Sequence, residues 1–260
     1  MRTLDRALSI LRLLSEAPAQ GMRLSEIARR TGMSKATSHR LLRALAVEGL
    51  VAGHSIIDGY ALGPELMILG RAAESKSLDV RGLARPTVER LAHDTGDSIF
   101  LQVRSGRYCI CIDRVLGNFP IKAFTIEIGA RRPLGIGGGS LALLSALEDD
   151  EIDLILDQNG PELAAVSKAV APAALRHQIQ RTRNLGYAIA LRHVHSRICS
   201  IGIAIGPTGR APIGAISVSA ISERFSKSRI DAIIEILLNH TKALTDELDR
   251  HKIATLARGF

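Results

Sequence analysis

Five polar side chains within one short segment have the types and the spacing to contact DNA. They are Lys35, Thr37, His39, Arg40 and Arg43. Arginine and lysine hydrogen-bond to guanine edges and to phosphates, and the shorter polar side chains bond to either group. At about 100° per residue, the basic side chains lie opposite an apolar stripe on the same helix. The stripe consists of Ser38, Leu41, Leu42 and Leu45.

The residues before this segment indicate how it is positioned. Gly32 and Met33 separate it from a preceding helix that we expect Ser25 to cap, and Ser34 is a good N-cap for the second helix. Two short helices with such a turn form a helix-turn-helix, whose second helix enters the major groove. A basic helix face that is only solvated is the alternative interpretation. The residues expected to contact DNA are Ser34, Lys35, Ala36, Thr37, His39, Arg40 and Arg43.

The flanking sequence extends this element to a winged helix-turn-helix over residues 1–63. Apolar residues at helical spacing in residues 4–14 predict a first helix that ends before Pro18. Two β-prone runs around Asp58 and Gly59 predict a hairpin wing. Residues 1–63 contain 9 Lys and Arg against 5 Asp and Glu, whereas the other 197 residues contain 25 against 21. The positive charge is therefore concentrated here, as a polyanionic partner requires.

Composition excludes several classes of protein. At 260 residues and 46% hydrophobic, the chain is long enough for a small and a larger domain. It has no uncharged apolar run of 18 residues, and MRTLDRALSI does not resemble a signal peptide, so we expect a cytoplasmic protein without a membrane partner. Three cysteines are an odd number and indicate reduced thiols. Aromatic residues make up only 3%, which argues against stacking on single-stranded bases.

Residues 64–78 predict a linker helix. Leu66, Leu69 and Ala73 form an amphipathic stripe behind Pro64, a residue favoured at the start of a helix. Helix-turn-helix proteins usually read paired half-sites as dimers. We therefore expect this helix to bring two chains together.

Residues 79–260 alternate between helical and β-rich stretches, which predicts an α+β domain with a mainly antiparallel sheet. A glycine-rich turn at residues 135–140 precedes one of the helices. The expected helices are at residues 80–95, 141–147, 148–155, 172–185 and 226–250. The expected strands are at residues 98–103, 108–115, 121–128, 187–191, 198–205 and 213–220.

This order of elements resembles the IclR family of bacterial transcription regulators along nearly the whole chain. The resemblance is carried by RTGMSKATSHRLLRALAVEGLV, GYALGPELMILG, GARRPLGIGGGSLALLSAL and PIGAISVSAISERF. It implies a GAF-like carboxy-terminal domain that binds a small organic acid effector. It also implies that the chains pair as a homodimer, or as a homotetramer built from two dimers, on operator DNA.

The family's pocket positions correspond to Gly138 and Gly139 in the turn, to the region around Ser200, and to Ser217 and Ser219. Glycines let a ligand approach the backbone, and we expect N–H groups at the start of the following helix to attract an anion. Alternation along a strand turns the hydroxyls of Ser217 and Ser219 to one face. The chain differs from the usual family turn, having Gly135 where a histidine is common, Ser140-Leu141 where Gly-Lys is common, and Ala190 where a polar or acidic residue is common. Arg192, which follows soon after, would favour an anionic ligand.

Other classes of function have weaker support in the sequence. The glycine turn has neither a P-loop lysine nor the spacing of a dinucleotide fingerprint, and Ser140 is not in a G-x-S-x-G elbow, so we expect neither an enzyme nor a bound cofactor. A metal-responsive regulator is the main alternative. It would use His193 with His195 and Cys109 with Cys111, since each pair projects to one side of an extended segment. No metal site is expected from this spacing alone.

Overall fold

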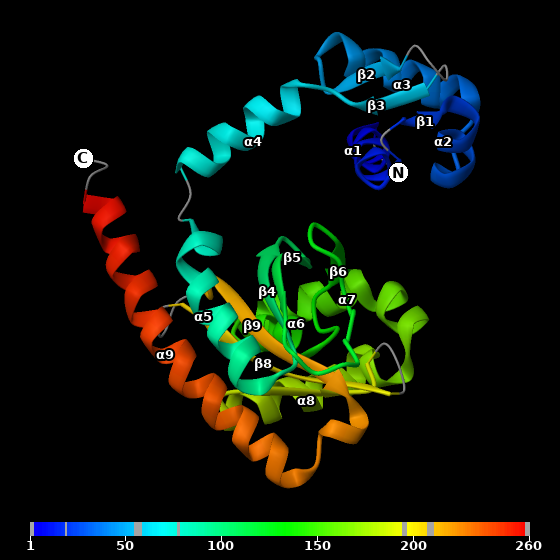
Figure 1. Ribbon diagram of the computed structural model, residues 1–260. Helices are drawn as coiled ribbons and strands as arrows, with labels where there is room; N and C mark the ends of the chain where they lie inside the picture. The colour runs from blue at the N-terminus through cyan, green and yellow to red at the C-terminus, as the bar shows by residue number, and fades with distance from the viewer. Residues whose placement is uncertain are drawn as a thin grey trace. The chain divides into compact units, whose positions relative to one another are not determined.

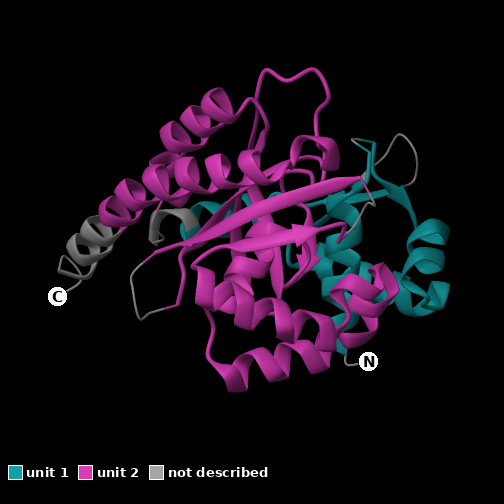
Figure 2. Ribbon diagram, turned by 90° about the horizontal axis from the view of Figure 1, so that it is seen from below, with its two compact units in different colours: residues 1–78 teal, residues 79–260 magenta. Residues whose placement is uncertain are grey.

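The computed structural model describes residues 3–18, 20–54, 59–76, 79–193, 197–206 and 211–257. The chain divides into two compact units, Met1–Leu78 and Asp79–Phe260 (Figure 2). Asp58 of the expected turn and His195 of the expected metal pair lie outside the described residues. Within the described part of the chain, no helix is both long enough and apolar enough to cross a membrane.

The described residues of the first unit before α4 form three helices and a three-stranded antiparallel sheet, which confirms the winged helix-turn-helix (Figure 1). Its core centres on Ile10, Ile27 and Leu42, one fully buried side chain from each helix. The helices are α1 (Thr3–Ser15), α2 (Leu24–Thr31) and α3 (Lys35–Val47). The strands are β1 (Met22–Arg23), β2 (Val51–His54) and β3 (Gly59–Leu62), in the order β1-β3-β2.

The start of α2 differs from the sequence prediction. Ser25 lies inside the helix, and the N-cap is Arg23, which makes no side-chain cap hydrogen bond. Because Arg23 pairs with Gly59 of β3, the chain passes directly from a short strand into the helix. A strand of two residues has no periodicity, so β1 was not predicted.

Helix α3 has the expected construction. Gly32 closes α2 in the left-handed conformation at φ +67°, where glycine has no side-chain clash. The hydroxyl of Ser34 then accepts the backbone N–H of Thr37 at 3.2 Å. The residues of α3 that are buried are Ser38, Leu41, Leu42 and Leu45, the stripe expected from their spacing.

Helix α4 (Glu65–Lys76) ends the first unit and leaves apolar side chains in solvent. Met67 is 72% exposed, Ile68 61% and Leu69 51%, while Leu66 is half-buried. The turn before it requires glycine, because a Cβ on Gly63 would lie 2.0 Å from a backbone oxygen. An exposed apolar surface of this kind on a helix is typical of a protein contact.

The second unit is built on a six-stranded antiparallel sheet in the order β6-β5-β4-β9-β8-β7, which confirms the α+β prediction. Its strands are β4 (Ser98–Ser105), β5 (Tyr108–Leu116), β6 (Arg131–Pro133), β7 (Ala188–Leu191), β8 (Ile198–Ile205) and β9 (Gly214–Ile221). Helices α5 (Val80–Thr95) and α9 (Lys227–Ala257) pack together on one face of the sheet (Figures 1 and 2). The other face carries α6 (Gly138–Ser145), α7 (Asp149–Val166) and α8 (Pro172–Leu185).

The strand expected at residues 121–128 was predicted wrongly. This segment is irregular, and β5 pairs instead with Arg131–Pro133, which forms the edge strand β6. Ala123 and Ile126 are buried while Ile121 and Phe124 are exposed, a spacing that no flat strand produces. The loop is held to β5 through its own backbone, since Gly129 donates to the Cys111 carbonyl and Cys111 to that of Ala130.

Candidate functional site

The basic face of α3 is open to solvent. Lys35, Ala36, His39, Arg40 and Arg43 are all exposed. Among the described residues, none forms an ion pair with Lys35, Arg40 or Arg43. These three cations therefore remain available for an external anion.

The first turn of α3 is ordered by the two hydroxyl residues expected to contact DNA. The Ser34 hydroxyl donates to the Thr37 hydroxyl at 2.9 Å and accepts the Thr37 N–H. Ser34 is exposed and Thr37 is half-buried. Both side chains thus stabilise the amino end of the helix, which is the part that contacts bases when a helix-turn-helix binds in the major groove.

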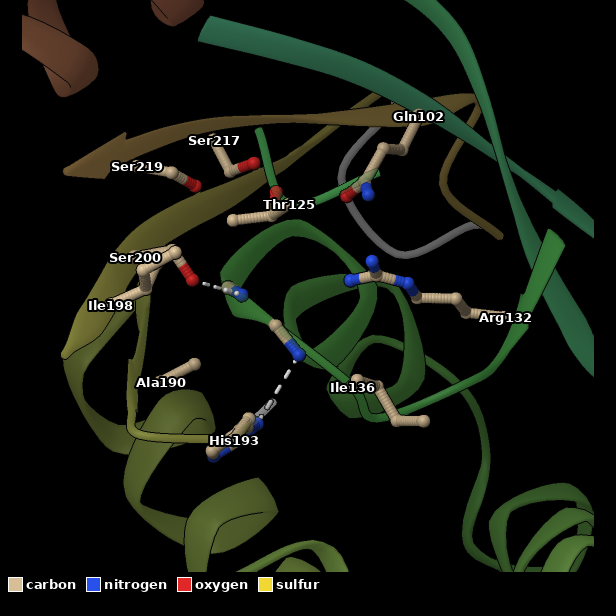
Figure 3. A pocket seen from close by; sticks show the side chains of 12 residues that line it. Gln102, Thr125, Arg132, Ile136, Ala190, His193, Ile198, Ser200, Ser217 and Ser219 are labelled. Carbon is tan, nitrogen blue, oxygen red and sulfur yellow. Dashed lines mark hydrogen bonds between the residues drawn. The ribbon is translucent and has the colours of Figure 1, made fainter. Parts of the chain in front are cut away.

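A small pocket lies in the second unit between the sheet and the start of α6 (Figure 3). Most of the residues around it are polar or small, and none is Phe, Tyr or Trp. Its lining consists of Gln102, Thr125, Arg132, Ile136, Gly137, Gly138, Ala190, His193, Ile198, Ser200, Ser217 and Ser219.

The serines come from two neighbouring strands. Ser200 of β8 is directly opposite Ser219 of β9 in the sheet, and Ser217 lies two residues before Ser219. Figure 3 shows the three hydroxyls on the side of the strands that faces the pocket. The hydroxyls of Ser217 and Ser219 make no hydrogen bond to another residue in the described part of the chain.

Two backbone N–H groups at the start of α6 are already hydrogen-bonded within the protein. The N–H of Gly138 donates to the Ser200 hydroxyl at 2.8 Å, and that of Gly137 donates to Nδ1 of His193 at 3.2 Å (Figure 3). The helix begins at Gly138, and not after Gly139 as expected. An anion at this helix start would therefore compete with two protein acceptors.

Close packing explains the glycines of the turn. A Cβ on Gly138 would lie 2.9 Å from the backbone of β8, and one on Gly202 of that strand would lie 2.3 Å from Gly138. Gly139 is not among the residues that line the pocket, but its Cβ would lie 2.1 Å from Oε1 of Gln102. Both glycines of the turn thus allow α6 to lie directly against the sheet.

The arginine that lines the pocket is not the one expected. Arg192 is exposed and outside the lining, with a left-handed backbone at φ +59°. Arg132 of β6 is half-buried and points into the pocket (Figure 3). Burial lowers the pKa of its guanidinium below the ordinary value. Sequence reasoning missed Arg132 because residues 121–128 were assigned to the strand that residues 131–133 form.

Gln102 is the second residue that sequence reasoning missed. Its side chain is 6% exposed, and its Oε1 atom has no hydrogen-bond partner among the described residues. The signal available was a single amide in the apolar run SIFLQV, on the same face of the strand as Phe100. A buried amide oxygen without a partner is costly, so it marks a place where a ligand donor fits.

The three described residues of the metal alternative, His193, Cys109 and Cys111, are hydrogen-bonded or neutral. Burial lowers the pKa of His193 to about 4, and its Nε2 atom lies 2.8 Å from Oε1 of Gln178. Burial also raises the pKa of Cys109 to about 12 and that of Cys111 to about 11, so both are thiols at neutral pH. In the described ranges no three His, Cys, Asp or Glu side chains gather as metal ligands.

Comparison with known proteins assigns both units. Residues 3–54 match the model of the IclR helix-turn-helix domain, and residues 72–246 match that of the bacterial transcriptional regulator IclR C-terminal domain. The glycerol operon regulatory protein of Streptomyces coelicolor is 32% identical over 234 residues, which cover 87% of each chain.

Solved structures share the fold. A crystal structure of a regulator of the IclR type from Silicibacter sp. TM1040 superposes with a TM-score of 0.76 at 24% identity, covering 95% of this chain and 96% of that one. An IclR homolog from Microbacterium hydrocarbonoxydans, crystallised in complex with 4-hydroxybenzoate, gives a TM-score of 0.70 at 20% identity and covers 95% and 99%.

Proposed function

This chain belongs to the IclR family and is a DNA-binding transcription regulator, and from that premise we propose that α3 reads an operator whose affinity is set by a small organic acid bound in the second unit. The proposal rests on one observation: the chain has two sites whose chemistry differs. Among the described residues, one site is a row of exposed cations without acidic partners, and the other is a polar pocket in which the hydroxyls of Ser217 and Ser219 are unpaired. The first suits a polyanion and the second suits a small polar molecule.

The basic face of α3 contains two kinds of expected contact. Arg40 and Arg43 have the reach and the donor geometry for guanine edges or phosphates, whereas Lys35 at the amino end supplies a flexible charge. Ser34, Thr37 and His39 add short polar contacts, and the small side chain of Ala36 lets the helix lie close to the DNA in the groove. The match of residues 3–54 to the helix-turn-helix domain of a family of transcription regulators supports duplex DNA as the partner.

Selection of bound duplexes from a random library by the full-length protein tests DNA recognition. We expect a symmetric consensus, because the proposed dimer presents two α3 helices. Arg40→Ala or Arg43→Ala should then lower the affinity for that consensus by about 1 to 3 kcal/mol if the contact is to a base edge. Arg12→Ala removes an exposed charge from α1 and serves as the control. Equal affinity of all three variants and the parent would contradict the role of α3.

The effector half of the proposal depends on the pocket. A related protein that binds 4-hydroxybenzoate supports an organic acid as the class of ligand. The ligand would be held by Ser200, Ser217, Ser219 and the glycine turn. The ligand can change the operator affinity only if it binds two conformations of the protein with different affinities, and the difference between these affinities limits the size of the change.

Operator binding measured with and without a panel of carboxylic acids tests regulation. We expect at least one acid to shift the operator affinity while sodium chloride at the same ionic strength does not. A second measurement, the rise in unfolding temperature at one fixed concentration of each acid, should rank the acids in the same order, because both measurements report binding to the folded protein. An operator affinity that no acid changes would contradict regulation by acids and leave DNA recognition intact.

A further inference from the structure

The pocket contains an arginine that lacks a protein anion. Arg132 reaches into it from β6, and no carboxylate among the described residues forms an ion pair with it. Three other half-buried arginines of the second unit have acidic partners. Arg104 pairs with Glu151, Arg107 with Glu162 and Arg114 with Glu127. Removing a guanidinium from water is costly unless an anion or strong acceptors replace the water.

The side-chain amide of Gln102 is independent evidence that the pocket binds a polar ligand. Oε1 of Gln102 is buried, has no partner in the part of the chain that the structure describes, and needs a donor. Figure 3 shows both the Gln102 amide and the Arg132 guanidinium pointing into the pocket. A guanidinium fork matches the two oxygens of a carboxylate. A ligand hydroxyl next to that carboxylate can donate to the Gln102 oxygen.

The other lining residues indicate which chemical groups the ligand can have besides its carboxylate. The hydroxyls of Ser217 and Ser219 are free to bond a second polar group, and the apolar contribution is limited to Ile136, Ala190 and Ile198. With no Phe, Tyr or Trp in the lining, an aromatic ring has no stacking partner among these side chains. At the start of α6, the N–H groups of Gly137 and Gly138 already donate to His193 and Ser200, so a carboxylate there would compete with two protein acceptors and is expected at Arg132 instead.

Resting on the proposed function, we infer that Arg132 determines the specificity of the pocket and that the effector is a short hydroxylated aliphatic carboxylate. Its carboxylate pairs with Arg132, and its hydroxyl groups bond to Gln102 and to the serines of β9. This assignment places the negative charge at the edge of the sheet, and neither at the helix start nor at Arg192.

Calorimetric titration of the full-length protein with matched probes tests the inference. The acids are glycolate, L-lactate and D-glycerate. The matched controls are L-lactamide, which lacks the charge, propionate, which lacks the hydroxyl, and benzoate, which has an aromatic ring. We expect at least one hydroxy acid to bind. L-Lactamide should bind at least about 10-fold more weakly, the size of one charge-assisted hydrogen bond, and propionate and benzoate, which lack the hydroxyl that donates to Gln102, at least about 3-fold more weakly.

The variants assign the charge to one residue. Arg132→Gln should weaken the bound hydroxy acid by about 10- to 100-fold and abolish the preference for acid over amide. Arg132→Lys keeps the charge without the fork and should lie between. Arg131→Gln is the matched control, since it removes the same charge from the adjacent residue, whose guanidinium lies 4.5 Å from the Tyr108 ring centre. Circular dichroism of each variant reports its folding, and Arg132→Lys supplies the answer if Arg132→Gln does not fold.

Three results would overturn the inference. They are an unchanged preference for acid over amide in Arg132→Gln, tighter binding of benzoate than of every hydroxy acid, and no binding of any hydroxy acid. In the first two cases an acid still binds and can still shift operator affinity, so regulation by an organic acid survives while the role of Arg132 or the ligand class falls. DNA recognition is measured separately, with the selected duplex.

Discussion

His193 is held in the pocket as a neutral ring. Its Nδ1 atom accepts the Gly137 N–H, which leaves Nε2 as the protonated nitrogen that bonds to Gln178. A proton on Nδ1 would remove the acceptor for Gly137. Burial opposes the charged form as well and lowers the pKa of His193 to about 4.

This arrangement predicts a loss of stability in weak acid. Because the unfolded ring has its ordinary pKa near 6.5, the unfolded state binds more protons than the folded state between about pH 4 and 6.5. The stability contributed by neutral His193 is therefore complete above pH 6.5 and is lost as the pH falls toward 4. From pH 7 to pH 5 the loss is about 2 kcal/mol.

Urea unfolding of the second unit at pH 7 and pH 5 measures this loss. In His193→Gln the difference between the two pH values should shrink by about 2 kcal/mol relative to the parent. His177→Gln is the control, because His177 is exposed on α8. An equal pH dependence in the parent and in His193→Gln would show that the ring is not the titrating group.

The thiols of β5 give a second test at the same scale. Since the pKa values of Cys109 and Cys111 are raised to about 12 and about 11, neither forms appreciable thiolate at pH 8. We expect iodoacetamide to modify both slowly in the folded protein and quickly in urea, as counted by peptide mass spectrometry. Fast modification of folded Cys109 or Cys111 would show that the strand opens readily.

Among the elements, α6 and β8 are in backbone contact. Gly202→Ala would place a methyl group 2.3 Å from the backbone of Gly138, where no side chain can move aside. We expect this variant to lose at least about 2 kcal/mol of stability through overpacking. Gly160→Ala is the control in the same unit, because its Cβ would meet Pro172 at an ordinary 3.7 Å and alanine favours the helix. Similar unfolding midpoints for the two variants would contradict the tight contact.

The elements also show where sequence reasoning succeeds. Helix α5 was predicted at its true bounds because its apolar spacing ends at Gly96, which adopts the left-handed cap. The β4–β5 hairpin was predicted because two β-prone runs meet at the turn residues Ser105 and Gly106. Both signals are local: the spacing and the turn lie within a few residues of each other.

The failures have a different origin. Residues 121–128 alternate weakly, but whether they pair depends on which segment β5 accepts at its edge, and it accepts residues 131–133. Arg132 enters the pocket only through that register, in which it is opposite Cys109. Ser200, Ser217 and Ser219 were assigned to the pocket through the family resemblance, whereas Arg132 and Gln102 depend on tertiary contacts of this chain.

At the scale of the whole molecule, the exposed apolar face of α4 predicts self-association. Leu66 and Leu69 lie on one stripe of the helix, and Leu69 is 51% exposed. Leu66→Asp combined with Leu69→Asp should shift the protein toward monomer in sedimentation and lower its operator affinity, since a monomer offers one α3 helix to a paired site. Leu154→Asp on α7 removes an equally exposed leucine and is the control. Sedimentation of the double variant as the parent would place the dimer contact elsewhere.

The position of Arg132 on the edge strand has a consequence for the evolution of such regulators. Strand β6 has three residues and pairs on one side only, with β5. None of its residues belongs to the buried apolar core. We therefore expect a substitution of Arg132 to change the charge that the pocket offers with less effect on folding than a substitution in the apolar core. Under the proposed function, a change at this one codon would be enough for related regulators to diverge in the signal that they recognise.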